Sequence, residues 1–180
     1  KEHIDSNKVK ADDSTKTISL EDDQMLIDLG SIAKGYTSDK ISKIMKNDGI
    51  ESAVVSLGGN VQAVGKKPDG SQWKVAIQNP FDENDYAAVV TVDDCAVITS
   101  GAYQRYFEQD GKTYHHIMDP STCAPADTDL ASVTIVSKDA TLADAYSTTL
   151  FILGKEKAVD FWRKNKNDFD IILIGKDNSV

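Results

Sequence analysis

Short runs of alternating hydrophobic and polar residues, a pattern typical of β-strands, recur through most of the chain. Gly, Pro, Asn and Asp separate these runs, and the short links favour antiparallel neighbours. The two runs around Gln109-Asp110-Gly111 form a hairpin signal. The strands predicted in this way span residues 17–20, 53–57, 61–64, 73–77, 87–92, 96–99, 103–108, 112–117, 132–136 and 171–174.

Three segments follow the helical period instead, at 36–47, 139–154 and 156–166. Asp48-Gly49 is a stop signal for the first helix, and Asp139 and Gly154 are suited to cap the two ends of the second. Strands in series with helices interspersed predict an α+β fold, a mixed or largely antiparallel sheet with packed helices, in one domain over residues 1–180. In the second helix the expected apolar stripe comprises Leu142, Ala145, Tyr146, Thr149 and Leu153.

The net charge argues against polyanionic partners that are bound through charge alone. Lys and Arg number 20 against 29 acidic residues, a formal charge of −9, so we expect no nucleic acid and no electrostatic grip on anionic lipid. No apolar segment reaches the roughly 20 residues that a membrane-spanning helix needs. The two cysteines, Cys95 and Cys123, are too few for a disulfide framework, and free thiols are favoured over one bridge.

The stretch from 28 to 36 concentrates several functional groups, reading D-L-G-S-I-A-K-G-Y. An acid (Asp28), a hydroxyl (Ser31) and a cation (Lys34) lie within nine residues, after the apolar run at 25–27 and before a helical pattern. We therefore expect a strand-to-helix turn, where unpaired backbone N–H groups can meet an anion.

A second candidate lies within the helix at 139–154. Asp144, Ser147 and Thr148 stand at i, i+3 and i+4, so their oxygen atoms share one helix face. Oxygen donors of this kind suit a hard cation such as Mg²⁺. The alternative is a solvated acid beside a threonine that bonds back to its own helix, and the spacing alone does not decide between them.

Two further motifs border predicted turns. In H-H-I-M-D-P, His116 and Asp119 can place an imidazole and an acid at the mouth of a cleft, although an Asp-Pro turn explains the same residues. Gly58 and Gly59 can let a flat ligand approach the backbone, or simply form a hairpin turn. The chain has no Walker loop, no G-x-G-x-x-G and no G-x-S-x-G, which argues against the common nucleotide-binding loops and against a serine hydrolase site.

Taken in order, the motifs resemble those of the ApbE family, the FAD:protein FMN transferases, over residues 27–175. The resemblance implies an enzyme that splits FAD at its pyrophosphate, moves FMN to a Thr or Ser hydroxyl of an acceptor flavoprotein and releases AMP. The blocks that carry it are D-L-G-S-I-A-K-G-Y, V-S-L-G-G-N, W-K-V-A-I-Q-N-P, I-T-S-G-A-Y, H-H-I-M-D-P-S-T, L-A-S-V-T-I-V and A-D-A-Y-S-T-T-L-F-I-L-G.

By position, the resemblance also implies roles for individual residues. Asp28 and Lys34 would contact FAD, as would Ile117 or Met118, beside the Gly58-Gly59 turn. His116 or Asp119 would orient the acceptor hydroxyl or its proton. Mg²⁺ would be held by Asp144, Ser147 and Thr148 and through the backbone carbonyl of Ser31. One departure is Cys123, which stands where the family usually has glycine after D-P-x-T.

The family further carries a substantial segment before the aspartate motif, so we expect this chain to be N-terminally truncated. Family resemblance also leads us to expect an extracytoplasmic protein, membrane-anchored through a lipid on that missing segment. Two alternatives to the transferase are kept. An FAD pyrophosphatase would use water in place of the hydroxyl, and an inactive remnant would bind flavin without turnover.

Overall fold

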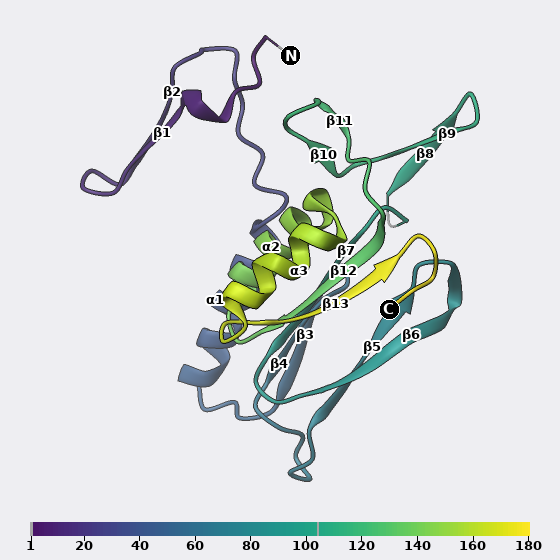
Figure 1. Cartoon of the computed structure of the whole chain (residues 1–180). Coiled ribbons are helices and arrows are strands. Elements are labelled where there is room, and N and C mark those ends of the chain that lie inside the picture. Colours follow the sequence, from purple (N-terminus) through teal and green to yellow (C-terminus); the bar gives the residue numbers. More distant parts are fainter. Residues whose placement is uncertain (1, 104) are drawn as a thin grey trace.

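The central layer is a five-stranded antiparallel sheet in the order β13-β12-β7-β4-β3. The computed structural model describes residues 2–103 and 105–180 (Figure 1). An antiparallel sheet with packed helices confirms the predicted α+β class. The strands of this sheet are β3 (Ala53–Leu57), β4 (Asn60–Val64), β7 (Ala96–Gly101), β12 (Leu130–Ser137) and β13 (Asp170–Gly175).

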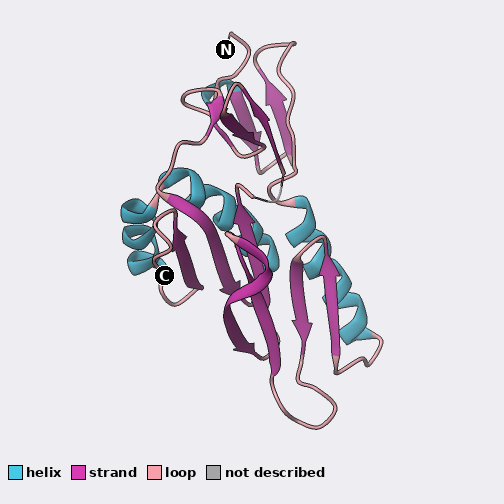
Figure 2. Ribbon diagram, turned by 90° about the vertical axis from the view of Figure 1, so that its right-hand side faces the viewer, coloured by secondary structure: helices cyan, strands magenta, loops and turns pink. Residues whose placement is uncertain are grey.

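Side chains alternate across this sheet and bury two separate faces. On one face, Ile98 and Ile135 pack against the helices and share a cluster with the helical residue Phe151. On the other, Val97 packs with Trp73 of a long hairpin. The helices are α1 (Ala33–Asn47), α2 (Ala140–Leu153) and α3 (Lys155–Asn165), and the hairpin consists of β5 (Trp73–Asn79) and β6 (Asp82–Val92). The sheet is thus the middle layer between the helices and the β5–β6 hairpin (Figure 1), and Figure 2 views the molecule from the hairpin side.

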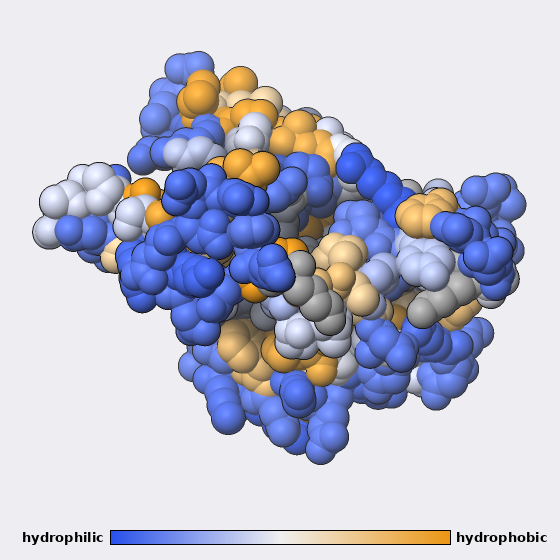
Figure 3. Space-filling model, turned by 90° about the horizontal axis from the view of Figure 1, so that it is seen from above, coloured by the Kyte–Doolittle hydropathy of each residue, from blue (hydrophilic) through white to orange (hydrophobic). Residues whose placement is uncertain are grey.

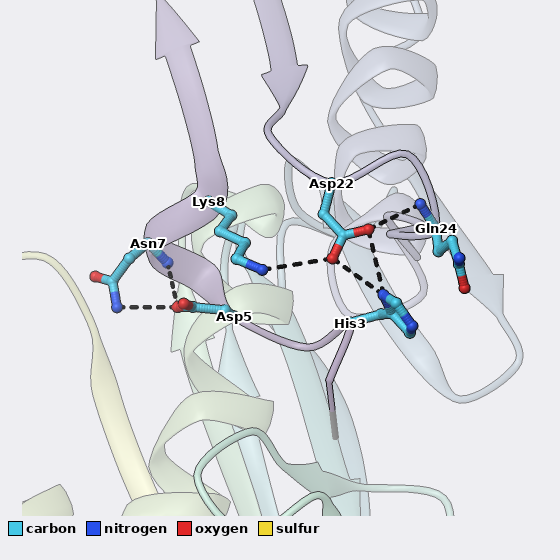
Figure 4. A network of polar contacts seen from close by, with 6 residues as sticks. All are labelled: His3, Asp5, Asn7, Lys8, Asp22 and Gln24. Atoms are coloured by element: carbon cyan, nitrogen blue, oxygen red, sulfur yellow. Dashed lines mark hydrogen bonds and ion pairs between the residues drawn. The ribbon is translucent and has the colours of Figure 1, made fainter.

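Three small hairpins extend from this body. The β1–β2 and β8–β9 hairpins project on opposite sides in Figure 1. The β1–β2 hairpin is tied together by side chains: Asp22 accepts from the ring of His3 and from Lys8 Nζ (Figure 4). The elements of these hairpins are η1 (Ser6–Lys8), β1 (Val9–Asp12), β2 (Thr17–Leu20), β8 (Tyr106–Gln109), β9 (Lys112–His115), β10 (Met118–Asp119) and β11 (Ala124–Pro125).

Most predicted elements are present, with small shifts at their ends. The helices at 36–47, 139–154 and 156–166 correspond to α1, α2 and α3. The strand predicted at 103–108 crosses residue 104, which lies outside the described residues, and its described part begins at Tyr106. Strands β1, β10 and β11 were not predicted, because two- to four-residue strands carry too little periodicity to recognise.

Two expectations are wrong, the strand at 25–27 and the apolar stripe of α2. The apolar run at 25–27 is not a strand in the structure; it leads into α1 as an irregular segment in which Leu26 is 94% exposed. The structure also shows that α1 turns Gly35, Ser38 and Ser42 toward the core and leaves Tyr36 and Ile44 exposed. In α2, the predicted stripe lies beside the buried face rather than on it. That buried face consists of Ala140, Ala143, Asp144, Ser147, Leu150 and Phe151.

The physical reason is close packing between α1 and α2, which favours small side chains over large apolar ones.

Both Cys95 and Cys123 are free thiols, as expected. In the part of the chain that the structure describes, none of the helices has the length and hydrophobicity that a membrane crossing demands. Seen from above, the mainly hydrophilic surface is interrupted by hydrophobic groups (Figure 3).

Candidate functional site

Asp144 lies at the centre of the candidate site, on the buried face of α2. Its side chain belongs to a residue only 3% exposed, so the solvated-acid alternative does not apply. Oδ2 accepts a hydrogen bond of 2.8 Å from the backbone N–H of Gly35, and Oδ1 accepts one of 2.9 Å from the amide of Asn60. Donors from α1 and β4 therefore meet on one carboxylate of α2.

The Gly35 contact depends on the absence of a side chain. A Cβ at Gly35 would meet the backbone oxygen of Ala140 well inside van der Waals contact and would lie 2.6 Å from the Cβ of Asp144. Asp39, one turn further along α1, accepts from the N–H groups of Ala140 and Thr141 at the start of α2. The sequence predicted a turn that meets an anion, and the anion that α1 meets is the chain's own Asp144.

Asn60 follows directly after the Gly58-Gly59 turn between β3 and β4. Both glycines have positive φ, 57° and 94°, which explains why this turn uses them. A Cβ at either position would meet nothing within 4 Å, so the turn presents open backbone beside the buried amide of Asn60. This open surface is what close approach of a flat ligand requires.

A cluster of three hydroxyl groups extends from Asp144 along α2. Ser100 of β7 lies 2.8 Å from Ser147 and 3.1 Å from Thr148, measured between hydroxyl oxygens. Ser147 also donates to the backbone oxygen of Asp144 at 2.9 Å. Ser147 is fully buried, whereas Thr148 is partly exposed, so Thr148 is the more accessible of the two predicted hydroxyl ligands.

The charge of this cluster is not balanced by the protein. Among the described residues, no Lys, Arg or His forms an ion pair with Asp144, whose two hydrogen-bond donors are both neutral. A buried carboxylate without a counter-charge is costly. A single carboxylate with hydroxyl oxygens nearby suits Mg²⁺, which keeps several waters and uses one or two carboxylates. The donor set therefore fits a hard divalent cation.

The structure does not bring every predicted residue of the D-L-G-S-I-A-K-G-Y motif to this carboxylate. Asp28 is exposed and accepts a 2.6 Å hydrogen bond from the N–H of Gly30, which closes a local turn. Ser31 and Lys34 are exposed on either side of the start of α1. Within the described residues no hydrogen bond joins Ser31 to Asp144. The motif contributes to the Asp144 junction through Gly35.

Two adjacent histidines at the end of β9 differ in their environment. Nε2 of His115 lies 3.1 Å from the carbonyl of Ala126, and its ring packs edge-on against Phe151 of α2. His116 is exposed, with Nδ1 3.2 Å from the carbonyl of Arg105. A carbonyl only accepts, so Nδ1 is the donor in this contact, and Nε2 is the nitrogen that the neutral ring would offer as an acceptor.

The neighbouring predicted residues also divide between inside and outside. Ile117 is 5% exposed and belongs to the main core, whereas Met118 on β10 is 48% exposed. Asp119 accepts from the N–H and the hydroxyl of Ser121, and these hydrogen bonds hold the pKa of its carboxyl below the ordinary value. A carboxylate with a lowered pKa is a weaker base. Ile117 shares the main core with Phe151, which lies further along α2 than Asp144.

Neither Asn60 nor Asp39 was predicted as part of the junction. The V-S-L-G-G-N motif contains Asn60, but only its glycines were interpreted. A polar residue directly after a glycine turn and before the apolar Val61 was the available signal. No cluster of three or more His, Cys, Asp or Glu side chains forms in the described residues, so the site is one that a search for clustered ligands overlooks.

Comparison with known proteins gives a consistent set of relatives. The model of the ApbE family matches residues 1–173. A protein of Klebsiella pneumoniae named FAD:protein FMN transferase is 38% identical over 170 residues, which cover 94% of this chain and 52% of that protein. One of the same name from Treponema pallidum is 44% identical over 173 residues, covering 91% and 48%. The chain thus spans about half the length of these curated relatives.

Solved structures show the same similarity in three dimensions. The ApbE protein of Thermotoga maritima superposes with a TM-score of 0.88 at 34% identity, covering 98% of this chain and 57% of that one. The flavin transferase ApbE of Vibrio cholerae gives a TM-score of 0.78 at 30% identity, covering 94% and 53%. The sheet, helices and hairpins described above are therefore an arrangement shared with these proteins.

Proposed function

The chain belongs to the ApbE family, and on that basis we propose that it acts in the transfer of FMN from FAD to a Thr or Ser hydroxyl of an acceptor flavoprotein, with release of AMP. The observation that carries the proposal is the junction at Asp144. There, a buried carboxylate without a counter-charge is held by Gly35 of one motif and Asn60 of another. A negatively charged pyrophosphate can use such a site only together with a cation.

Mg²⁺ is the cation that we propose, held by Asp144 with Thr148 and Ser147, and by the backbone carbonyl of Ser31. When bound, it would neutralise charge on the pyrophosphate oxygens as the P–O bond breaks. The chain's own part is to keep the carboxylate oriented and largely dry. Ser100 supports that role because it bonds to both hydroxyl groups of α2.

The transfer itself requires one bond to form and one to break. The acceptor hydroxyl oxygen attacks the phosphorus on the FMN side of the pyrophosphate, and the bridging P–O bond breaks so that AMP leaves with the bridging oxygen. The hydroxyl proton passes to a base. We assign this base to His116, whose exposed ring faces a carbonyl with Nδ1 and so leaves Nε2 as the nitrogen that can take the proton, rather than to Asp119, whose pKa is lowered.

Nucleotide contacts follow from the exposed residues around the junction. Lys34 supplies a cation at the start of α1, where it can approach phosphate oxygens, and Asp28 keeps one carboxylate oxygen outside its local turn. Gly58 and Gly59 offer open backbone for a flat ring, and Met118 is the accessible residue of the Ile117-Met118 pair. These assignments rest on exposure and on the family resemblance together.

The experiment combines the protein with FAD, Mg²⁺ and an acceptor flavoprotein domain that carries a Thr or Ser flavinylation site. We expect the acceptor to gain the mass of FMN and to become fluorescent after denaturation, with one AMP released for each FMN transferred. The matched control replaces Thr148 by Val, which keeps the shape of the side chain and removes its hydroxyl oxygen.

Other outcomes identify other functions. FMN and AMP formed equally fast without acceptor would indicate an FAD pyrophosphatase, and flavin binding without turnover would indicate an inactive binding protein. Either result would overturn the transferase proposal.

We also propose an extracytoplasmic, membrane-anchored location for the full protein, on the family resemblance alone. Fractionation of cells that produce the native gene product tests that location, and recovery in the cytoplasm would contradict it.

A further inference from the structure

Asn60, the first residue of β4, reaches from the sheet to Asp144 of α2. It is 3% exposed, and its Nδ2 donates to Oδ1 of Asp144 at 2.9 Å. Residues alternate along β4, so Asn60 and Gln62 share the face that α1 covers. A buried amide is costly unless it is hydrogen-bonded, and the bond to Asp144 offsets that cost.

We infer that Asn60 is a positioning residue, which orients Asp144 so that its carboxylate is ready for a divalent cation. The inference rests on the proposed function, because it assigns to Asn60 a role toward the same cation. It goes further by naming a residue that does not ligand the cation. Hydrogen-bond partners that orient a ligating carboxylate are typically worth about 10- to 100-fold in metal affinity.

The geometry explains why two donors are needed. A carboxylate on a helix can rotate about χ1 and χ2, and one hydrogen bond leaves part of that rotation free. Gly35 holds Oδ2 and Asn60 holds Oδ1, and the two donors come from different elements. Both oxygens retain further acceptor capacity, since a carboxylate offers about four lone-pair sites. The plane of the carboxylate is fixed while its remaining lone pairs stay available.

Asn60 also links this carboxylate to the surface that we assign to the flavin nucleotide. It directly follows Gly58 and Gly59, whose backbone is open. Because β3 and β4 pair in register through Leu57 and Asn60, the position of the turn depends on the position of Asn60. Loss of the amide therefore acts on Asp144 and on the turn through one residue.

The test measures Mg²⁺ affinity directly, by titration calorimetry of the protein without flavin or acceptor. Asn60→Leu keeps a side chain of similar size and removes the donor. We expect its Mg²⁺ affinity to fall by about 10- to 100-fold. Mn²⁺ binding followed by electron paramagnetic resonance gives a second readout that does not depend on activity.

Gln62→Leu is the matched control. Gln62 is also buried on β4, but its amide donates to the carbonyl of Ala63 at 2.8 Å rather than to α2. We expect this variant to lose stability and to keep the wild-type Mg²⁺ affinity. If Gln62→Leu loses as much affinity as Asn60→Leu, the effect belongs to the strand in general and the inference is overturned.

The remaining outcomes separate this inference from the proposed function. Wild-type affinity in folded Asn60→Leu overturns the role of Asn60 and leaves the proposed cation site standing. No Mg²⁺ or Mn²⁺ binding in the wild type overturns the cation site itself. Circular dichroism establishes that each variant is folded. If Asn60→Leu does not fold, Asn60→Ser replaces it, because the smaller side chain relieves crowding and does not reach Asp144.

Discussion

Asp144 and Asp119 are both carboxylates of the predicted site, and their surroundings differ in a way that bears on function. Asp144 is buried where α1, α2 and β4 meet, and its donors lie 109 and 84 residues away in sequence. Asp119 lies in a hairpin turn and takes its hydrogen bonds from Ser121, two residues away. One carboxylate is held by the tertiary fold, the other by its own turn.

Only the Asp144 part of the site is held in place by packing before any ligand arrives. Packing over long sequence distances fixes the Asp144 junction, so a cation would find its carboxylate already oriented. Asp28, Lys34 and His116 are exposed. The side chain of Asp28 is bonded only within its own turn, and that of His116 to the nearby carbonyl of Arg105, among the described residues. We therefore assign cation binding to the junction, and contact with the nucleotide and the acceptor to the periphery.

Gly35→Ala is the change that should break the junction most severely. The new Cβ would collide with the backbone of Ala140 and with Asp144, so α1 and α2 must separate. We expect a loss of about 3 kcal/mol in the free energy of unfolding, at the upper end for overpacking. Urea denaturation followed by circular dichroism measures it.

The control for Gly35→Ala is Lys43→Ala on the exposed side of the same helix. Surface substitutions of this kind change stability by at most about 0.5 kcal/mol. Equal stability of the two variants would contradict the close approach of α1 and α2 and, with it, the contrast between the junction and the periphery.

Protonation of His115 should change the free energy of unfolding by an intermediate amount, because this residue connects a peripheral hairpin with the core. Burial, which disfavours the charged ring, lowers its pKa from the ordinary value of 6.5. The unfolded chain then binds the proton more readily than the folded one. The contribution to stability is present above pH 6.5 and declines as the pH falls toward the folded pKa.

Nuclear magnetic resonance titration of the imidazole measures this pKa in the folded protein. His115→Phe retains an aromatic ring against Phe151 and should remove this part of the pH dependence of stability. A folded pKa at or above 6.5 would show that His115 is not buried as described and would place it with the periphery.

Ser121→Ala should change the free energy of unfolding least among these variants. The Ser121 hydroxyl and N–H lower the pKa of Asp119 from 3.8, and loss of the hydroxyl should raise it part of the way back. Because the folded pKa is the lower one, this turn's contribution to stability is present above pH 3.8 and is lost as the pH falls through the folded value. Carbon-13 titration of the carboxyl group checks the shift, and an unchanged pKa would refute the assignment.

The fold was largely predictable from sequence, because its strands and helices carry their own periodicity and stop signals. Asp139 and Gly154, for example, end α2 at the predicted places. The error over which face of α2 is buried has a physical cause. The first part of the core side of this helix, from Ala140 to Ser147, holds small and polar residues, and only its last turn adds Leu150 and Phe151, so the apolar pattern is too short to mark this face.

The candidate site was predictable only in part. Spacing placed Asp144, Ser147 and Thr148 on one face, since residues at i, i+3 and i+4 always share one. The partnership of Asp144 with Asn60 and Gly35 depends on how three elements pack, which no local pattern contains. The resemblance to the ApbE family included the block that contains Asn60 without showing that Asn60 belongs to the junction.

We propose that the buried carboxylate of Asp144 is prepared for a divalent cation. The most direct test compares urea unfolding of the wild type and of Asp144→Asn, each with and without Mg²⁺. At about 100 times its dissociation constant, Mg²⁺ should stabilise the wild type by about 2.7 kcal/mol and leave the variant unchanged. Equal stabilisation of both proteins, or none of the wild type, would contradict the account.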